Sequence, residues 1–278
     1  MKILNQIVVS SCLVLVFLTH THCKVGQGFV NALMPDISED VKIGAQANQE
    51  IANNSKEFPL LPESGNEQVY SYVRGITAKI LNSGSLKHRN DFPWVVKIIN
   101  DNKTLNAFCT PGGYIYVYTG LIKYLDSEDQ LAGVMGHEIA HADNRHSMQQ
   151  MVQLYGIQAL ASIGAQVATK NSGDGTQKAA MTAAQVASAL VGLKFSRAHE
   201  TDADNSSVRY LCNTDYNAAG SAGFFEKISN EATPPEWLST HPNPSNRVQN
   251  IYKQSKEAGC IGSGKNAQQY QKIKQLLK

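Results

Sequence analysis

The chain of 278 residues has few of the features that would assign it to a class at once. Lys and Arg total 25 and Asp and Glu total 23, so no excess of positive charge indicates a nucleic-acid partner. The five cysteines contain no Cys-x-x-Cys pair, which excludes a zinc ribbon and a thioredoxin-like site. Hydrophobic residues make up 42%, too many for a disordered chain and too few for a multi-span membrane protein. The length fits one large globular domain or two small ones.

The N-terminus has the pattern of an export signal. Lys2 precedes an apolar run of 12 residues over 7–18, a length typical of a signal peptide and short for a membrane span. Cys23 lies where a lipoprotein cysteine would be, although the residues before it depart from a bacterial lipobox. We therefore predict a signal peptide or N-terminal anchor over 1–22 and a linker over 23–38. Cleavage, lipidation at Cys23 and retention as a membrane anchor all stay open.

Export would place the remaining cysteines in an oxidising compartment, where one disulfide is expected. Cys212 and Cys260 are the favoured pair because both lie in polar, turn-rich sequence. Cys109 follows Phe108 in an apolar run, so we predict a buried free thiol at that position.

Helical and strand patterns follow one another along residues 39–278, the predicted main domain. Apolar spacing, cap residues and composition predict helices at 39–53, at 69–80, from 127, in both halves of the Ala-rich stretch 151–193, at 196–211, at 249–256 and at 267–278. Runs of β-branched and aromatic residues predict strands at 94–99 and 114–119. The expected fold class is α+β, mainly helical with a small sheet.

One segment carries a pattern with a chemical meaning. His137, Glu138 and His141 form the motif H-E-x-x-H. On a helix, positions i and i+4 share a face, so both imidazoles can bind one metal ion. Glu138 lies about a hundred degrees around the helix from His137, beside the ion. There it can take a proton from water and return one to a leaving amine.

A catalytic zinc site needs a third protein ligand. Glu200 is the next glutamate after Glu138, and it shares one predicted helix face with Asp204 at i+4. Glu200 can therefore bind the ion while Asp204 accepts a hydrogen bond from the far nitrogen of a ligand histidine. A solvated acidic face is the alternative for this pair, and His199 is a rival third ligand. His146 fits a position behind the ligands or at the surface.

Four blocks of sequence, taken in order, resemble the HtpX-like zinc metallopeptidases, the gluzincin family that includes the periplasmic BepA-like and LoiP-like proteases. The blocks are 106–121 (NAFCTPGGYIYVYTGL), 136–146 (GHEIAHADNRH), 195–204 (FSRAHETDAD) and 239–247 (STHPNPSNR). Asp202 stands where the family more often has glutamate. The resemblance covers roughly residues 39–255, most of the predicted main domain.

The resemblance implies a zincin-like fold, with residues 39–278 as a zinc metallopeptidase domain. It implies that His137, His141 and Glu200 bind one Zn(2+) per chain. Asp204 would then lie behind a ligand histidine.

The resemblance also implies roles around the metal. His241 would lie near the ion, either stabilising the oxyanion or occupying the open zinc position in a latent state. Arg247 would pair with an acidic residue of the site. An edge strand of the sheet would line the cleft and take up substrate backbone as a further strand, through Gly113, Tyr114, Ile115 and Tyr116.

The predicted function is that of a zinc-dependent endopeptidase of the cell envelope with Glu138 as general base. By resemblance, its substrates are misfolded or unassembled envelope proteins in a Gram-negative periplasm, and its N-terminus could attach it to the membrane. The alternative is a zinc-containing envelope chaperone or assembly factor with little or no proteolysis. The stretch 151–193 could also cover the cleft as a lid, with Gly173 and Gly175 as the hinge.

Overall fold

The computed structural model describes residues 34–156, 183–231, 235–242, 246–260, 262, 264 and 266–277. The predicted signal, Cys23, most of the linker and the predicted hinge at Gly173 and Gly175 lie outside the described residues.

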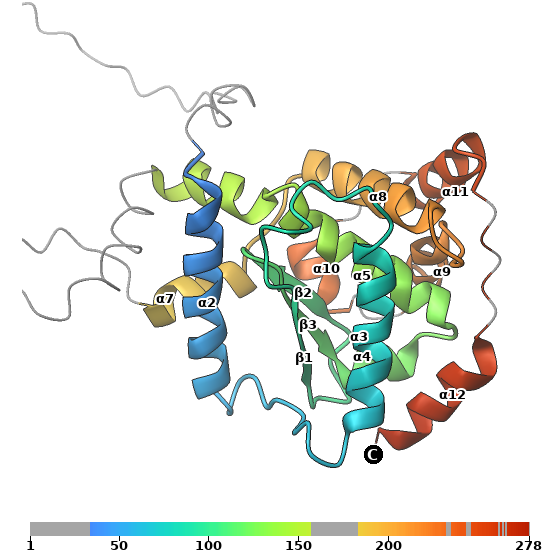
Figure 1. Cartoon of the computed structure of the whole chain (residues 1–278), viewed down its shortest axis with the longest axis horizontal. Coiled ribbons are helices and arrows are strands. Elements are labelled where there is room, and N and C mark those ends of the chain that lie inside the picture. Colours follow the sequence, from blue (N-terminus) through green and yellow to red (C-terminus); the bar gives the residue numbers. More distant parts are fainter. Residues whose placement is uncertain are drawn as a thin grey trace, which may run out of the picture.

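The described part of the chain is mainly helical around a small sheet, as expected for the α+β class. Its labelled helices are α2 (Ile37–Asn53), α3 (Glu67–Leu81), α4 (Thr119–Tyr124), α5 (Glu128–Asp143), α7 (Ala183–Val191), α8 (Arg197–Cys212), α9 (Gly220–Ile228), α10 (Trp237–Thr240), α11 (Arg247–Glu257) and α12 (Ala267–Leu276), and residues 146–156 are also helical. Figure 1 shows α2 and α7 packed together at one end of the molecule and α11 and α12 at the other. Among the described residues, no helix is both long and apolar enough to cross a bilayer.

The two helices that carry the chemical motifs begin at serine caps, near the positions where the sequence predicts the helices to start. Ser127 starts α5 by accepting a hydrogen bond from the backbone N–H of Gln130 at 3.3 Å. Ser196 starts α8 in the same way, accepting from the backbone N–H of His199 at 3.1 Å. Each bond satisfies an amide that has no partner inside its own helix. Local sequence therefore fixes where both helices start.

The sheet of the described region has three strands in the order β1-β3-β2. They are β1 (Val95–Ile99), β2 (Ala107–Thr110) and β3 (Tyr114–Tyr118). β3 pairs with β1 in parallel and with β2 antiparallel. β1 and β3 match the predicted strands, whereas β2 has no sequence signal of its own. It has only four residues (AFCT) and lacks the longer run of β-branched and aromatic residues that predicts β1 and β3.

The expectation that Gly113, Tyr114, Ile115 and Tyr116 lie at an edge of the sheet is wrong. β3 is the central strand, and its backbone is paired with β1 on one side and with β2 on the other. The turn at 111–113 connects β2 to β3, and the two strands form a β-hairpin. β2 is the edge strand that packs against α5. A peptide that joined the sheet beside α5 would therefore pair with β2.

Helix α5 lies inside the molecule, packed against α8, α9, α3 and β2. Every residue over 131–143 is buried. Two glycines allow the neighbouring helices to come close. A Cβ added to Gly133 would lie 2.1 Å from the Ser221 nitrogen of α9, and one on Gly136 would lie 2.6 Å from Ser207 Oγ of α8. Because of this burial, the segment over 131–143 has no solvent-exposed polar face, and the H-E-x-x-H motif lies in the core.

We predict opposite effects for two Gly→Ala substitutions in helices. Gly133→Ala should lower the free energy of unfolding by about 1–3 kcal/mol, because the new methyl group collides with the backbone of α9. In Gly75→Ala of α3, the new methyl group meets no atom within 4 Å. This substitution should raise the free energy of unfolding by about 0.5–1 kcal/mol, since alanine loses less backbone entropy than glycine on folding. Urea unfolding of both variants measures the difference. Equal effects of the same sign would contradict the packing described for α5.

The disulfide of the described region joins Cys212, at the end of α8, to Cys260, which follows α11. These are the two cysteines that the sequence favoured as a pair, and their Cα atoms are 4.8 Å apart. Cys109 is a free and buried thiol. Burial raises its pKa well above the usual value, so this cysteine is expected to be unreactive.

Candidate metal centre

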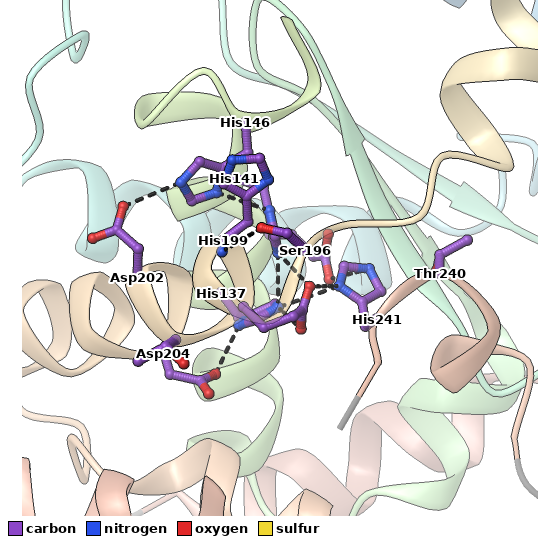
Figure 2. Close-up of polar contacts among 12 residues, drawn as sticks. His137, His141, His146, Ser196, His199, Asp202, Asp204, Thr240 and His241 are labelled. Atoms are coloured by element: carbon purple, nitrogen blue, oxygen red, sulfur yellow. Dashed lines mark hydrogen bonds and ion pairs between the residues drawn. The ribbon is translucent and has the colours of Figure 1, made fainter. Parts of the chain in front are cut away.

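Two helices and one loop bring four potential metal-binding side chains together. His137 and His141 project from α5, Glu200 projects from α8, and His241 follows α10 directly. One donor atom from each lies within 4.8 Å of the others, and all four residues are buried. The two imidazoles and the distant carboxylate predicted from the sequence therefore converge, and Figure 2 shows the three histidine rings meeting at one point.

The inward-facing atoms have the arrangement of metal ligands. His137 Nε2 lies 3.0 Å from His141 Nε2, and the Glu200 carboxylate lies 3.5 and 3.4 Å from these two nitrogens. Glu200 Oε2 is buried and has no hydrogen-bond partner in the described part of the chain. The outer nitrogen of His137, Nδ1, is 2.9 Å from Asp204 Oδ1, which directs the lone pair of Nε2 inward. When His137 is neutral, the inward nitrogens of both histidines and the carboxylate of Glu200 form a donor set that fits a divalent cation.

Burial and charge tune the three predicted ligands. Burial holds the pKa of His141 well below its usual range, so the ring stays neutral and able to bind a metal. Burial also acts to raise the pKa of Glu200, but the facing histidines outweigh it and hold that pKa well below its usual value. For His137, burial opposes the charged form, yet Asp204 and Glu200 raise its pKa to about 9. A metal ion at this site must therefore displace a proton from His137.

Glu138 lies beside the four donors with one oxygen unused. Its Oε1 accepts a hydrogen bond from Nε1 of Trp237 at 3.2 Å and is 3.5 Å from Nε2 of His241. Its Oε2 is buried without a hydrogen-bond partner among the described residues. Burial raises the pKa of Glu138, which makes its carboxylate a stronger proton acceptor than an exposed one.

His241 lies within the donor cluster, as the resemblance implies. Its Nδ1 is 3.1 Å from Glu200 Oε1 and 3.3 Å from His137 Nε2. Its ring stacks on the buried indole of Trp237, with centroids 4.2 Å apart and planes 8° apart. The sequence analysis did not predict a role for Trp237. Its spacing of four residues from His241 is the one sequence signal that could have indicated that the two rings lie close together.

Arg247 pairs with two acidic residues of the site. Its Nη2 donates a hydrogen bond to Asp204 Oδ1 at 2.7 Å, and its Nη1 lies 3.2 Å from Glu200 Oε2. The guanidinium is buried and covers the ring of Phe225 at 3.8 Å. It therefore balances the negative charge of both carboxylates while it closes the back of the cluster.

The two histidines that the sequence left open lie outside the donor cluster of the described region. His199 is adjacent to Glu200 on α8 but lies on another face of the helix, where its ring stacks against His146. His146 lies behind His141, with the Nδ1 atoms of the two rings 3.1 Å apart. Neither ring contributes a donor to the cluster.

This combination of fold and site is that of a zincin-like metallopeptidase. Residues 67–255 match peptidase family M48, and the chain belongs to this family of metal-dependent peptidases.

The relatives of this chain include a bacterial protease and a mitochondrial metalloendopeptidase. The chain is 32% identical over 166 residues to the beta-barrel assembly-enhancing protease of Escherichia coli, a match that covers 56% of this chain and 33% of that protein. It is 32% identical over 181 residues to the mitochondrial metalloendopeptidase OMA1 of Danio rerio, covering 60% of this chain and 36% of that protein. The chain thus spans about a third of the length of these relatives.

Proposed function

We propose that the chain is a zinc-dependent endopeptidase of the cell envelope that cuts misfolded or unassembled envelope proteins. The observation that carries the proposal is the convergence of His137, His141 and Glu200 on one point, with an unpartnered oxygen of Glu138 beside it. Membership of family M48 and the printed names of the relatives support it.

Zinc is the proposed metal because of the donor set. Two imidazoles and one carboxylate are the protein ligands typical of catalytic zinc in hydrolases. When bound, the ion lowers the pKa of a water molecule and polarises the carbonyl of the bond to be cut.

Glu138 is the proposed general base and then the general acid. Its Oε2 accepts the proton of the attacking water and later delivers it to the leaving amine. The indole of Trp237 holds Oε1, so the unpartnered oxygen is the one that exchanges the proton. His241 is placed either to stabilise the oxyanion or to fill the fourth position of the ion in a latent state.

The substrate is proposed to bind in extended form along β2. This strand is the edge of the sheet next to α5, the helix that carries both histidines. Main-chain hydrogen bonds along an edge strand recognise backbone instead of particular side chains, which suits unfolded protein segments as substrates.

Export to the periplasm is proposed from the N-terminal sequence. The apolar run over 7–18 provides the signal, and Cys23 offers a site for lipid attachment. The disulfide between Cys212 and Cys260 fits an oxidising compartment. N-terminal sequencing and mass analysis of the mature protein distinguish simple cleavage, a lipidated Cys23 and an uncleaved anchor.

Metal analysis combined with a cleavage assay tests the proposed activity. We expect one zinc ion per chain and cleavage of an unfolded model protein such as reduced casein. A chelator should abolish the cleavage, and added zinc should restore it. Protein purified without chelator that contains no zinc, or cleavage that survives complete removal of the metal, would contradict the proposal.

The alternative function is an envelope chaperone or assembly factor that contains zinc and rarely cuts. The position of His241 within the donor cluster favours a resting state with little proteolysis. If a Glu138→Gln variant that cannot cut retains every cellular function of the wild type, the chaperone role is favoured over the protease.

A further inference from the structure

The groups behind the two histidines of the H-E-x-x-H motif differ. His137 Nδ1 lies 2.9 Å from the carboxylate of Asp204. His141 Nδ1 lies 3.1 Å from another imidazole nitrogen, Nδ1 of His146. The far nitrogen of His146, Nε2, is in turn 3.1 Å from Asp202 Oδ2. Figure 2 shows this chain of contacts extending from His141 away from the other two rings.

Asp202 determines where the hydrogens lie along this chain. Its side chain is 55% exposed, and an ionised carboxylate can only accept hydrogen bonds. His146 Nε2 must therefore carry a hydrogen, and the other nitrogen of a neutral imidazole is then an acceptor. It follows that His141 Nδ1 carries a hydrogen and donates it to His146. His141 Nε2 is left with a free lone pair directed at His137 and Glu200.

We propose that His146 and Asp202 are positioning residues that hold His141 in the tautomer able to bind the metal. The proposal rests on the zinc site proposed above, and it deepens it. Asp204 orients His137 through one hydrogen bond, whereas Asp202 orients His141 through the ring of His146. The two ligands thereby gain equivalent hydrogen-bond support from opposite ends of the site.

A specific turn of the backbone places His146 behind His141. Helix α5 ends at Asp143, and Arg145 has a φ of 58°, a left-handed conformation that residues other than glycine rarely adopt. The Arg145 guanidinium is held at 2.6 Å by the fully buried carboxylate of Asp40 and at 2.7 Å by the carbonyl of Pro35. In a continuous helix, a residue at i+5 would lie on another face and could not reach His141.

Ring stacking fixes the orientation of both imidazoles. His146 stacks on His199, with centroids 4.5 Å apart and planes at 17°. His141 stacks on Phe195, with centroids 3.9 Å apart and planes at 27°. The Nδ1 atom of His199 is buried and has no hydrogen-bond partner among the described residues. His199 thus supports the ring of His146 without joining the hydrogen-bond chain, which makes it a matched control.

Zinc affinity, measured by competition with a chromogenic chelator, tests the proposal without relying on activity. His146→Phe keeps an aromatic ring but removes the acceptor, and it should weaken zinc binding by about 10- to 100-fold. His199→Phe makes the same exchange in the neighbouring ring and should leave the affinity unchanged. His146→Gln restores an acceptor oxygen and should recover most of the loss. Asp202→Ala, a change at a half-exposed side chain, should weaken binding less than His146→Phe does.

The thermal melting of each metal-free variant shows whether it is folded. If His146→Phe does not fold, the other two variants test the proposal. Near-normal zinc affinity in His146→Gln together with weakened zinc binding in Asp202→Ala supports it. Wild-type affinity in both His146→Phe and Asp202→Ala, or an equal loss in His199→Phe, would overturn it. Absence of zinc binding by the wild type would instead overturn the proposed function, and this proposal with it.

Discussion

Replacing Glu138 with glutamine should lower the rate of cleavage of an unfolded protein by about 10²–10⁴-fold, while zinc content stays at one ion per chain. Glutamine keeps the shape of the side chain, and its oxygen can still accept the hydrogen bond from Trp237. Its amide group cannot take up the proton that the Oε2 atom of Glu138 is placed to accept. The rate should fall in kcat, and KM should change little, because the change leaves the proposed substrate strand intact.

The same substitution at Glu128 provides a control within the same helix. Glu128 is also a buried glutamate of α5, but its carboxylate accepts hydrogen bonds from the hydroxyls of Tyr72 and Tyr216, far from the donor cluster. Glu128→Gln should therefore retain the cleavage rate of the wild type. Undiminished cleavage by Glu138→Gln, with its zinc content confirmed, would show that another group moves the proton.

The parts of the site that helical periodicity alone predicts correctly are those that depend on a single helix. The pairing of His137 with His141 follows from the i, i+4 geometry of α5, and the position of Asp204 relative to Glu200 follows from the same geometry in α8. Both helices also start at serine caps that are visible in the sequence. Helical periodicity is sufficient to predict these pairs, because the geometry of a single helix determines which of its side chains share a face.

The parts that the sequence does not predict depend on contacts between distant segments. β2 is too short, with four residues, to show a strand pattern of its own, so its pairing with β3 is decided by the tertiary fold. As a result, the predicted edge strand is in fact the centre of the sheet. Trp237 reaches Glu138 across 99 residues of chain, a contact with no local pattern.

His146 shows where helical periodicity stops being a guide. Extending the periodicity of α5 places His146 on another face from His141, yet the two rings are in contact. The helix ends at Asp143, and the left-handed residue that follows depends on an ion pair with Asp40, more than a hundred positions away. Backbone turns that are held by distant partners leave no trace in the periodicity of the sequence.

Glu200→Gln should weaken zinc binding by more than about 100-fold and abolish cleavage of the unfolded substrate. The neutral amide is a poor ligand for zinc, and it removes the only negative charge of the predicted trio. It also removes the ion pair between Glu200 Oε2 and Nη1 of Arg247, 3.2 Å apart, and leaves Asp204 to balance the buried guanidinium. Asp204→Asn is the graded comparison, because Asp204 touches His137 and Arg247 and stands outside the donor cluster.

The chelator competition used for His146 ranks these two variants on one scale. Asp204→Asn should weaken zinc binding by about 10- to 100-fold, a smaller loss than that of Glu200→Gln. The reason is that Asp204→Asn disturbs the orientation of one metal ligand, His137, but removes no ligand. If Glu200→Gln binds zinc as tightly as the wild type, the third ligand is another group. His241 would then be the next residue to replace, because its Nδ1 lies 3.3 Å from His137 Nε2. A greater loss in Asp204→Asn than in Glu200→Gln would instead show that the orientation of His137 controls binding more than the carboxylate ligand does.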